Sequence, residues 1–166
     1  MRTFFDFEFI EEGSAFVMEP ISIGMVREDG EEYYAEFQGV NWERANDWVR
    51  TNVRPYLTGP IKRRVVIAKE IMEFVGEKPE FWAYFADYDW VLLCQLYGRM
   101  IDLPEGWPMY CLDLKQLMWH HDVHKGNLPD NINAHNALAD ARWNKNAFNT
   151  ITDSIRGGGL PLIRPR

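Results

Sequence analysis

The chain has 166 residues, of which 46% are hydrophobic and 26% charged, and its net charge is −7 at pH 7. This length suits one domain with one core, and no apolar run reaches the roughly 20 residues that a membrane-spanning helix needs. The negative charge argues against a protein that grips nucleic acid mainly through lysine and arginine contacts to phosphates.

Three antiparallel strands are predicted for the first part of the chain. Residues 3–10 form an aromatic and β-branched run, and residues 20–26 form a second apolar run, as strands do. The pair Asp29-Gly30 is a typical hairpin turn. Residues 32–37 should therefore return as the third strand.

Two helices are expected next. Residues 42–52 space their apolar side chains as a helix does, and Asn41 stands in front of them as the expected cap. Two prolines and a glycine then break the chain before residues 61–75. This second helix should have an apolar side that consists of Val65, Ala68, Ile71, Met72 and Val75.

Strands and helices alternate in the second half of the predicted structure. The aromatic run 81–85 is typical of a short strand buried on both faces. A very apolar helix follows, which begins at Tyr88 or Asp89 and ends at Gly98. We further expect a strand at residues 109–112, a short helix at 113–120 and a long helix at 136–155.

These elements predict an α/β fold in which helices flank a mixed five-stranded sheet. One domain is expected over residues 1–156, followed by a glycine- and proline-containing tail at 157–166. The two cysteines, Cys94 and Cys111, are too few for a disulfide framework, and Asp6 comes too early for a secretory signal. A cytoplasmic protein with free thiols is the expectation.

Acidic residues interrupt the first apolar run. Asp6 and Glu8 should project from one face of the strand, roughly 7 Å apart, and Phe5, Phe7 and Phe9 from the other. Acidic side chains are costly to bury unless positive charge neutralises them, and carboxylate oxygens suit Mg²⁺ or Mn²⁺. For this pair alone, a solvated strand face is the commoner explanation.

Two further acids stand near expected helix starts. Asp89 follows the aromatic strand, where Asp87 competes with it, and Asp140 lies in the first turns of the last helix. Each could bind a metal, but each could equally cap or stabilise a helix N-terminus. Neither position alone decides between these roles.

His135 is expected in the loop before the last helix, with Asn133 or Asn136 as the cap. A loop histidine can move toward a substrate and accept a proton from water near neutral pH. An ordinary surface histidine is the alternative. A zinc site is a weaker possibility at the cluster formed by His120, His121 and His124.

Taken together, these residues resemble the three motifs of the DEDDh exonucleases, in order and spacing. The motifs are Asp6-Phe7-Glu8, then Asp89, then His135 followed five residues later by Asp140. The resemblance implies a ribonuclease H-like fold and cleavage of single strands from the 3′ end. It also implies that two divalent ions, Mg²⁺ or Mn²⁺, are bound by the four acids and that His135 is the general base.

Longer stretches resemble the RNase AS exoribonucleases of actinobacteria, which are specific for polyadenylate, at residues 6–11, 21–24, 32–35, 48–53 and 88–98. This resemblance implies a homodimer, and a terminal nucleotide bordered by Phe7, Glu8, Phe9, Ile10 and His135. Phe7 stands where the family usually has threonine. Beside the nucleotide, that change would remove a hydroxyl and add bulk.

We therefore predict a metal-dependent 3′-5′ exoribonuclease that releases 5′-mononucleotides from single-stranded RNA, with a preference for adenine-rich RNA. The alternatives are an exonuclease for short mixed RNA or single-stranded DNA, and a nuclease-like module that binds without cutting. One basic region could contact RNA phosphates or a second subunit, or could be a solvated surface; it contains Arg50, Arg54, Lys62, Arg63 and Arg64.

Overall fold

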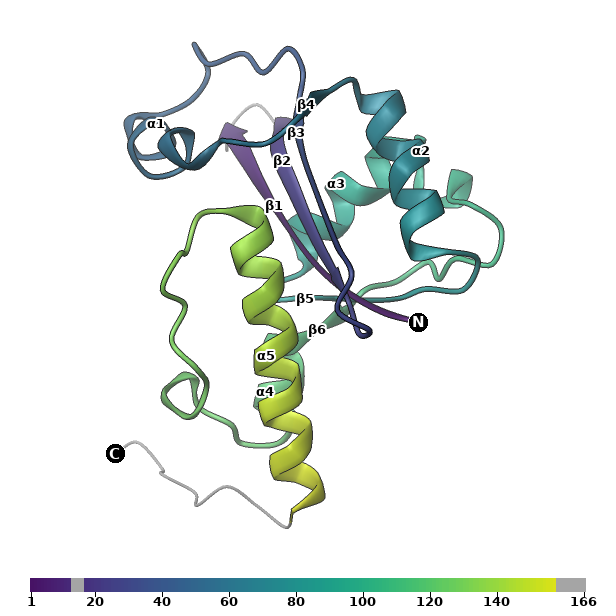
Figure 1. The fold of residues 1–166 in the computed structure, drawn as a ribbon, viewed down its shortest axis with the longest axis vertical. Helices are drawn as coiled ribbons and strands as arrows, with labels where there is room; N and C mark the ends of the chain where they lie inside the picture. The colour runs from purple at the N-terminus through teal and green to yellow at the C-terminus, as the bar shows by residue number, and fades with distance from the viewer. Residues whose placement is uncertain (13–16, 158–166) are drawn as a thin grey trace.

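The computed structural model describes residues 1–12 and 17–157, and these form a six-stranded mixed sheet flanked by helices (Figure 1). The strand order is β4-β3-β2-β1-β5-β6, in which β1, β2 and β3 are antiparallel and the three short strands pair in parallel. The strands are β1 (Arg2–Glu12), β2 (Val17–Arg27), β3 (Glu32–Phe37), β4 (Ile61–Lys62), β5 (Glu80–Ala83) and β6 (Leu112–Asp113).

Helices cover both faces of the sheet. The α-helices are α1 (Asp47–Asn52), α2 (Arg64–Val75), α3 (Asp87–Tyr97), α4 (Leu114–His120) and α5 (Ala137–Arg156). Short 3₁₀ turns occur at η2 (Arg54–Tyr56), η3 (Met100–Asp102) and η4 (Lys125–Asn127). Figure 1 shows α2 and α3 together on one side of the molecule, with α5 running beside the sheet and α4 lying behind α5.

The alternation of side chains along β1 divides the core in two. Phe5 and Phe7 pack with residues of α2 and α3, whereas Phe4 packs with residues of α4 and α5. Because alternate side chains share a face, Asp6 and Glu8 project on the same side as Phe4. The strand thereby presents its two acids to the face that α5 covers.

The predicted fold class and the three-stranded antiparallel start are confirmed, and Gly30 turns the hairpin with a φ of 99°. The helix expected from residue 61 is wrong at its start, since Ile61 and Lys62 form a sixth strand instead. The backbone N–H groups of Glu36 and Gln38 donate to the carbonyls of Pro60 and Lys62, which fixes this segment as a strand.

The apolar side of α2 also differs from the prediction. Ile67, Ile71 and Val75 are buried, whereas Val65 and Met72 are exposed. The expected helix over 42–52 begins only at Asp47, because Asn46 is the cap and its Oδ1 accepts from the Val49 N–H at 2.8 Å.

Asn41 instead closes a turn, where its side chain accepts from the Glu43 N–H. The strand expected at 109–112 is displaced to Leu112–Asp113, and Met109 and Tyr110 are exposed. Of the predicted tail, 157–166, Gly157 caps the end of α5, and residues 158–166 lie outside the described residues. Across the described part of the chain, no helix has the length and apolarity to cross a bilayer.

Candidate active site

Three of the four predicted acids meet on the face of the sheet that α5 covers. Asp6 and Glu8 come from β1 and Asp140 from the first turn of α5, and one carboxylate oxygen of each lies within 4.8 Å of the others. Residues more than 130 positions apart in the sequence thus form one acidic group.

A glycine in β2 lets α5 approach the sheet closely enough for this arrangement. Gly24 is the β2 partner of Asp6, and a Cβ atom there would lie 2.3 Å from the backbone carbonyl of Ala137. One turn beyond Asp140, the buried Asn144 donates from Nδ2 to the Phe5 carbonyl at 2.9 Å. These two contacts set the position of Asp140 above β1.

Asp89 reaches the site from α3 and is not a helix cap. β5 pairs with β1 only as far as Phe4, so β1 lacks a β5 partner at Phe7. The buried Asp89 carboxylate takes that place and accepts from the Phe7 N–H at 2.7 Å. It therefore lies beside the three clustered carboxylates, although its oxygens are not among those within 4.8 Å of one another.

The four acidic side chains are shielded from solvent and repel one another when they are charged. The pKa of Asp6 is raised well above its ordinary value, mainly by burial and further by repulsion from the charges of Asp89, Asp140 and Glu8. Burial and the charges of Asp140 and Asp89 raise the pKa of Glu8 to about 8. Burial also raises the pKa of Asp89 to about 7, although the hydrogen bond from the Phe7 N–H opposes the change.

The pKa of Asp140 is raised as well. Burial raises its pKa, while hydrogen bonds from the Asn131 side chain and the His135 N–H oppose the rise. In the described ranges, no lysine or arginine forms an ion pair with any of the four carboxylates. A set of hard oxygen donors without a protein cation suits divalent metal ions.

The raised pKa values predict how the stability of the metal-free protein depends on pH. Between about pH 4 and pH 8 the folded state holds more protons on these carboxyls than the unfolded state does, so unfolding becomes easier as pH rises. In chelator, Tm should therefore fall from about pH 5 to about pH 8. Added Mn²⁺ should raise Tm more at pH 8 than at pH 5, because protons compete for the same oxygens.

Thermal melts across this pH range, with and without the ion, measure both effects. The Arg99 guanidinium lowers the pKa of Asp102 to about 2. Carboxyls of this kind gain their protons at more acidic pH, so they do not change the dependence of Tm on pH between pH 5 and pH 8. A metal-free Tm that rises steadily from pH 5 to pH 8 would contradict the described electrostatics.

His135 occupies the predicted loop, exposed, directly before the capping residue of α5. Asn136, rather than Asn133, is that cap, and its Oδ1 accepts from the Ala139 N–H at 3.1 Å. The backbone N–H of His135 donates to Oδ2 of Asp140 at 2.8 Å. A direct hydrogen bond thus joins the loop to the acidic group.

Two of the residues predicted to border the nucleotide, Phe7 and Ile10, have buried side chains. Phe7 is 3% exposed and stacks on Phe37, and Ile10 is buried in a separate apolar cluster. Because the Phe7 ring is packed in the core, its replacement of a threonine adds no bulk to an exposed surface. Phe9 is partly buried and packs edge-on against the exposed ring of Tyr88.

This placement predicts the outcome of restoring threonine. Phe7→Thr should cost roughly 3 kcal/mol of unfolding free energy, because it leaves a cavity and a hydroxyl in the core. Urea denaturation measures the loss, and the exposed Tyr110 supplies a control, since Tyr110→Thr should change stability little. A variant of normal stability with an altered base preference would show that Phe7 faces the substrate.

The histidine cluster and the basic region were the other candidate sites in the sequence. Among the described residues, the one group of histidine, cysteine and acidic side chains that could hold a metal is Asp6, Glu8 and Asp140, so the histidines of residues 120–124 make no zinc site. Several basic side chains are engaged locally: Arg50 donates to the Trp42 carbonyl, Arg54 stacks on Trp42, and Lys62 pairs with Glu70.

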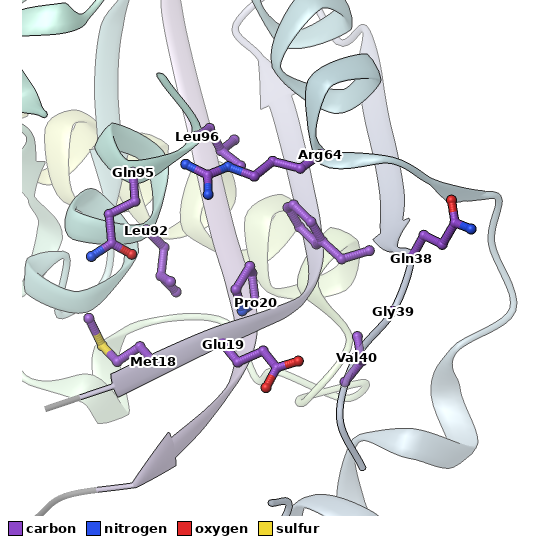
Figure 2. Close-up of a pocket in the computed structure, with 11 residues that line it drawn as sticks. Met18, Glu19, Pro20, Gln38, Gly39, Val40, Arg64, Leu92, Gln95 and Leu96 are labelled. Carbon is purple, nitrogen blue, oxygen red and sulfur yellow. The ribbon is translucent and has the colours of Figure 1, made fainter. Parts of the chain in front are cut away.

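A pocket of about 210 Å³ lies on the other side of the sheet, between α3, the start of α2 and residues of β2 and β3. Figure 2 shows Arg64 reaching from the start of α2 toward α3, with Gln95 on the opposite wall. None of the four acids lines this pocket. Sequence reasoning missed it because its polar lining residues come from separate elements.

Other site residues were also missed. Asn131 binds Asp140, and Gly24 makes room for α5. An asparagine in a loop and a glycine in a strand carry no distinctive sequence signal. Their roles arise from contacts between distant segments.

The family model of the 3′-5′ exoribonuclease Rv2179c-like domain matches residues 1–152. The chain belongs to this family. Two curated Mycobacterium tuberculosis proteins are similar over 95% of this chain and 97% of their own length, each at 40% identity. They are named 3′-5′ exoribonuclease Rv2179c and 3′-5′ exoribonuclease MT2234.1.

Solved structures of exonuclease I have the same fold. Escherichia coli exonuclease I with a dT13 oligonucleotide superposes with a TM-score of 0.63 at 13% identity, over 94% of this chain and 41% of that chain. Its complex with dA16 gives 0.62 at 14% identity, over 92% of this chain and 40% of that chain. The Rv2179c-like chain thus spans about 40% of exonuclease I and has its ribonuclease H-like architecture.

Family membership confirms the predicted enzyme class, a 3′-5′ exonuclease.

Proposed function

We propose that this chain is a metal-dependent 3′-5′ exoribonuclease that removes 5′-mononucleotides from the 3′ end of single-stranded RNA. The observation that carries the proposal is the acidic group of Asp6, Glu8 and Asp140, with Asp89 beside it. Membership in the exoribonuclease family and the names of the M. tuberculosis relatives support RNA as the substrate.

The four carboxylates are the proposed ligands of two divalent ions, Mg²⁺ or Mn²⁺. Such ions lower the pKa of an attacking water and stabilise the oxygen that leaves. The protein contributes fixed oxygen donors: β1 holds two, α5 holds one, and Asp89 is held by its bond to the Phe7 N–H. Glu8 additionally faces the terminal 3′-hydroxyl in this proposal.

His135 is the proposed general base. Water attacks the last phosphodiester phosphorus and passes a proton to the imidazole, while the bond from phosphorus to the 3′-oxygen of the preceding nucleotide breaks. That oxygen takes up a proton and becomes the new 3′-hydroxyl, and the released product is a 5′-mononucleotide. The position of His135 beside Asp140 supports this role.

The terminal base is proposed to lie against Phe9 and Tyr88. These rings follow Glu8 and precede Asp89 in the sequence, and their centroids are 5.8 Å apart. Stacking on aromatic rings is a sequence-tolerant contact worth roughly 1–3 kcal/mol per base. The likeness to RNase AS supports a preference for adenine, and the buried Phe7 does not oppose it.

A direct comparison of substrates tests this proposal. With Mn²⁺ present, 5′-labelled oligoadenylate should be shortened stepwise from its 3′ end, faster than oligouridylate and faster than the deoxy-oligomer. Equal rates on ribo- and deoxy-oligomers would remove RNA specificity, because the 2′-hydroxyl distinguishes the two. No cleavage, together with no divalent binding by calorimetry, would favour a module that binds without cutting.

Three further expectations remain proposals. The exonuclease domain is assigned to residues 1–156, which the family match over 1–152 supports. A homodimer, as the likeness to RNase AS implies, can be measured by light scattering. A cytoplasmic location is proposed on the two free cysteines.

A further inference from the structure

The loop that carries His135 is held by a segment 80 or more residues earlier in the sequence. Figure 1 shows α1 next to the chain that leads into α5. Trp48 of α1 packs edge-on against the His135 ring, with centroids 4.7 Å apart and an interplanar angle of 86°. Beside this contact, Nδ2 of Asn136 donates to the Tyr56 carbonyl at 3.2 Å.

Trp48 has no evident role in the core. Its side chain is 52% exposed, and α1 buries only Val49. A half-exposed indole offers a large and rigid surface for contact with a neighbouring ring. The partner here is the proposed proton acceptor.

The backbone of His135 is strained, with a φ of 73° in the left-handed region. Non-glycine residues adopt this region at a cost, and they keep it when neighbouring contacts determine the conformation. Three contacts do so here: the Trp48 ring, the bond from the His135 N–H to Asp140, and the bond from Asn136 to Tyr56.

We propose that Trp48 is a positioning residue, which holds the His135 imidazole where it can accept the proton of the attacking water. This inference rests on the proposed function of His135. A histidine on an exposed loop would otherwise sample several rotamers, and general-base catalysis requires the ring within hydrogen-bond reach of the water. Trp48 restricts the ring from one side, while Asp140 fixes the backbone.

The chain offers a matched control for the contact. Trp119 packs edge-on against His120 with centroids 5.2 Å apart and is 77% exposed. This second tryptophan–histidine pair lies in α4, and neither residue belongs to the acidic group. Trp119→Ala therefore removes the same kind of surface contact without touching the His135 loop.

Steady-state kinetics on a labelled oligonucleotide test the proposal. Trp48→Ala should lower kcat about tenfold with KM little changed, Trp48→Phe should restore most of the loss, and Trp119→Ala should have no effect. In a His135→Ala background, adding Trp48→Ala should change kcat by less than about twofold, because one residue acts through the other. An equal tenfold loss in that background, or a raised KM with normal kcat, would show that Trp48 contacts the substrate instead and would overturn the proposal.

Nuclear magnetic resonance of the metal-free protein gives a second readout, independent of activity. The imidazole proton shifts of His135 should lose their ring-current contribution in Trp48→Ala and keep it in Trp119→Ala. Unchanged shifts in Trp48→Ala would overturn the proposal even if kcat falls. A His135→Ala variant with normal kcat would instead overturn the proposed function of His135, so the two failures are distinguishable.

Discussion

Asp6→Asn is expected to lower kcat by roughly 10³-fold or more. Asp6 is the centre of the acidic group, because the charges of Asp89, Asp140 and Glu8 all act on it. An amide removes one negative charge and one strong metal-binding oxygen, so divalent binding should weaken in parallel. Release of mononucleotides from a labelled oligonucleotide at saturating Mn²⁺, with calorimetric titration of the ion, measures both losses.

The same variant should fold normally. Removing one of four repelling carboxyls relieves the metal-free protein, so its Tm at pH 8 in chelator should rise. Glu11→Gln is the matched control, since Glu11 lies on the same strand, is exposed and is not a member of the acidic group. Normal turnover by a folded Asp6→Asn variant would exclude this group as the catalytic site.

Gly24→Ala should destabilise the protein by roughly 3 kcal/mol and reduce activity further than stability alone explains. The added Cβ would lie 2.3 Å from backbone atoms of Ala137, which cannot move aside as a flexible side chain can. α5 must then shift away from β2, and the shift carries Asp140 away from Asp6 and Glu8.

Gly126→Ala is the control for this substitution. A Cβ atom added at Gly126 would meet no heavy atom within 4 Å, and this glycine does not have a positive φ. Urea denaturation and the rate of oligonucleotide hydrolysis should separate the two variants clearly. If Gly24→Ala kept normal stability and kcat, the close approach of α5 would not be needed to place Asp140.

Elements with a strong local pattern could be predicted from the sequence. The alternation in β1 and the Asp29-Gly30 turn determine the antiparallel start without help from distant contacts. Ile61 and Lys62 were misassigned because their strand depends on pairing with β3. Asn41 and Asn46 both suit a helix cap, and only the tertiary structure decides between them.

The candidate site also contains some residues that the sequence pattern reveals and others that depend on contacts between distant segments. The acids and His135 could be found because their spacing matches a family pattern. Phe7 was assigned to the nucleotide although the alternation that places Asp6 and Glu8 on one face places Phe7 on the other. The contact of Trp48 with His135 joins segments whose proximity no local pattern reveals.

The position of Asp140 near the far end of the described chain has a consequence during synthesis. A ribosome releases β1 first and α5 last among the described elements, so a growing polypeptide carries Asp6 and Glu8 long before it gains their partner. Until α5 emerges and docks on β2, the nascent protein lacks a complete acidic group.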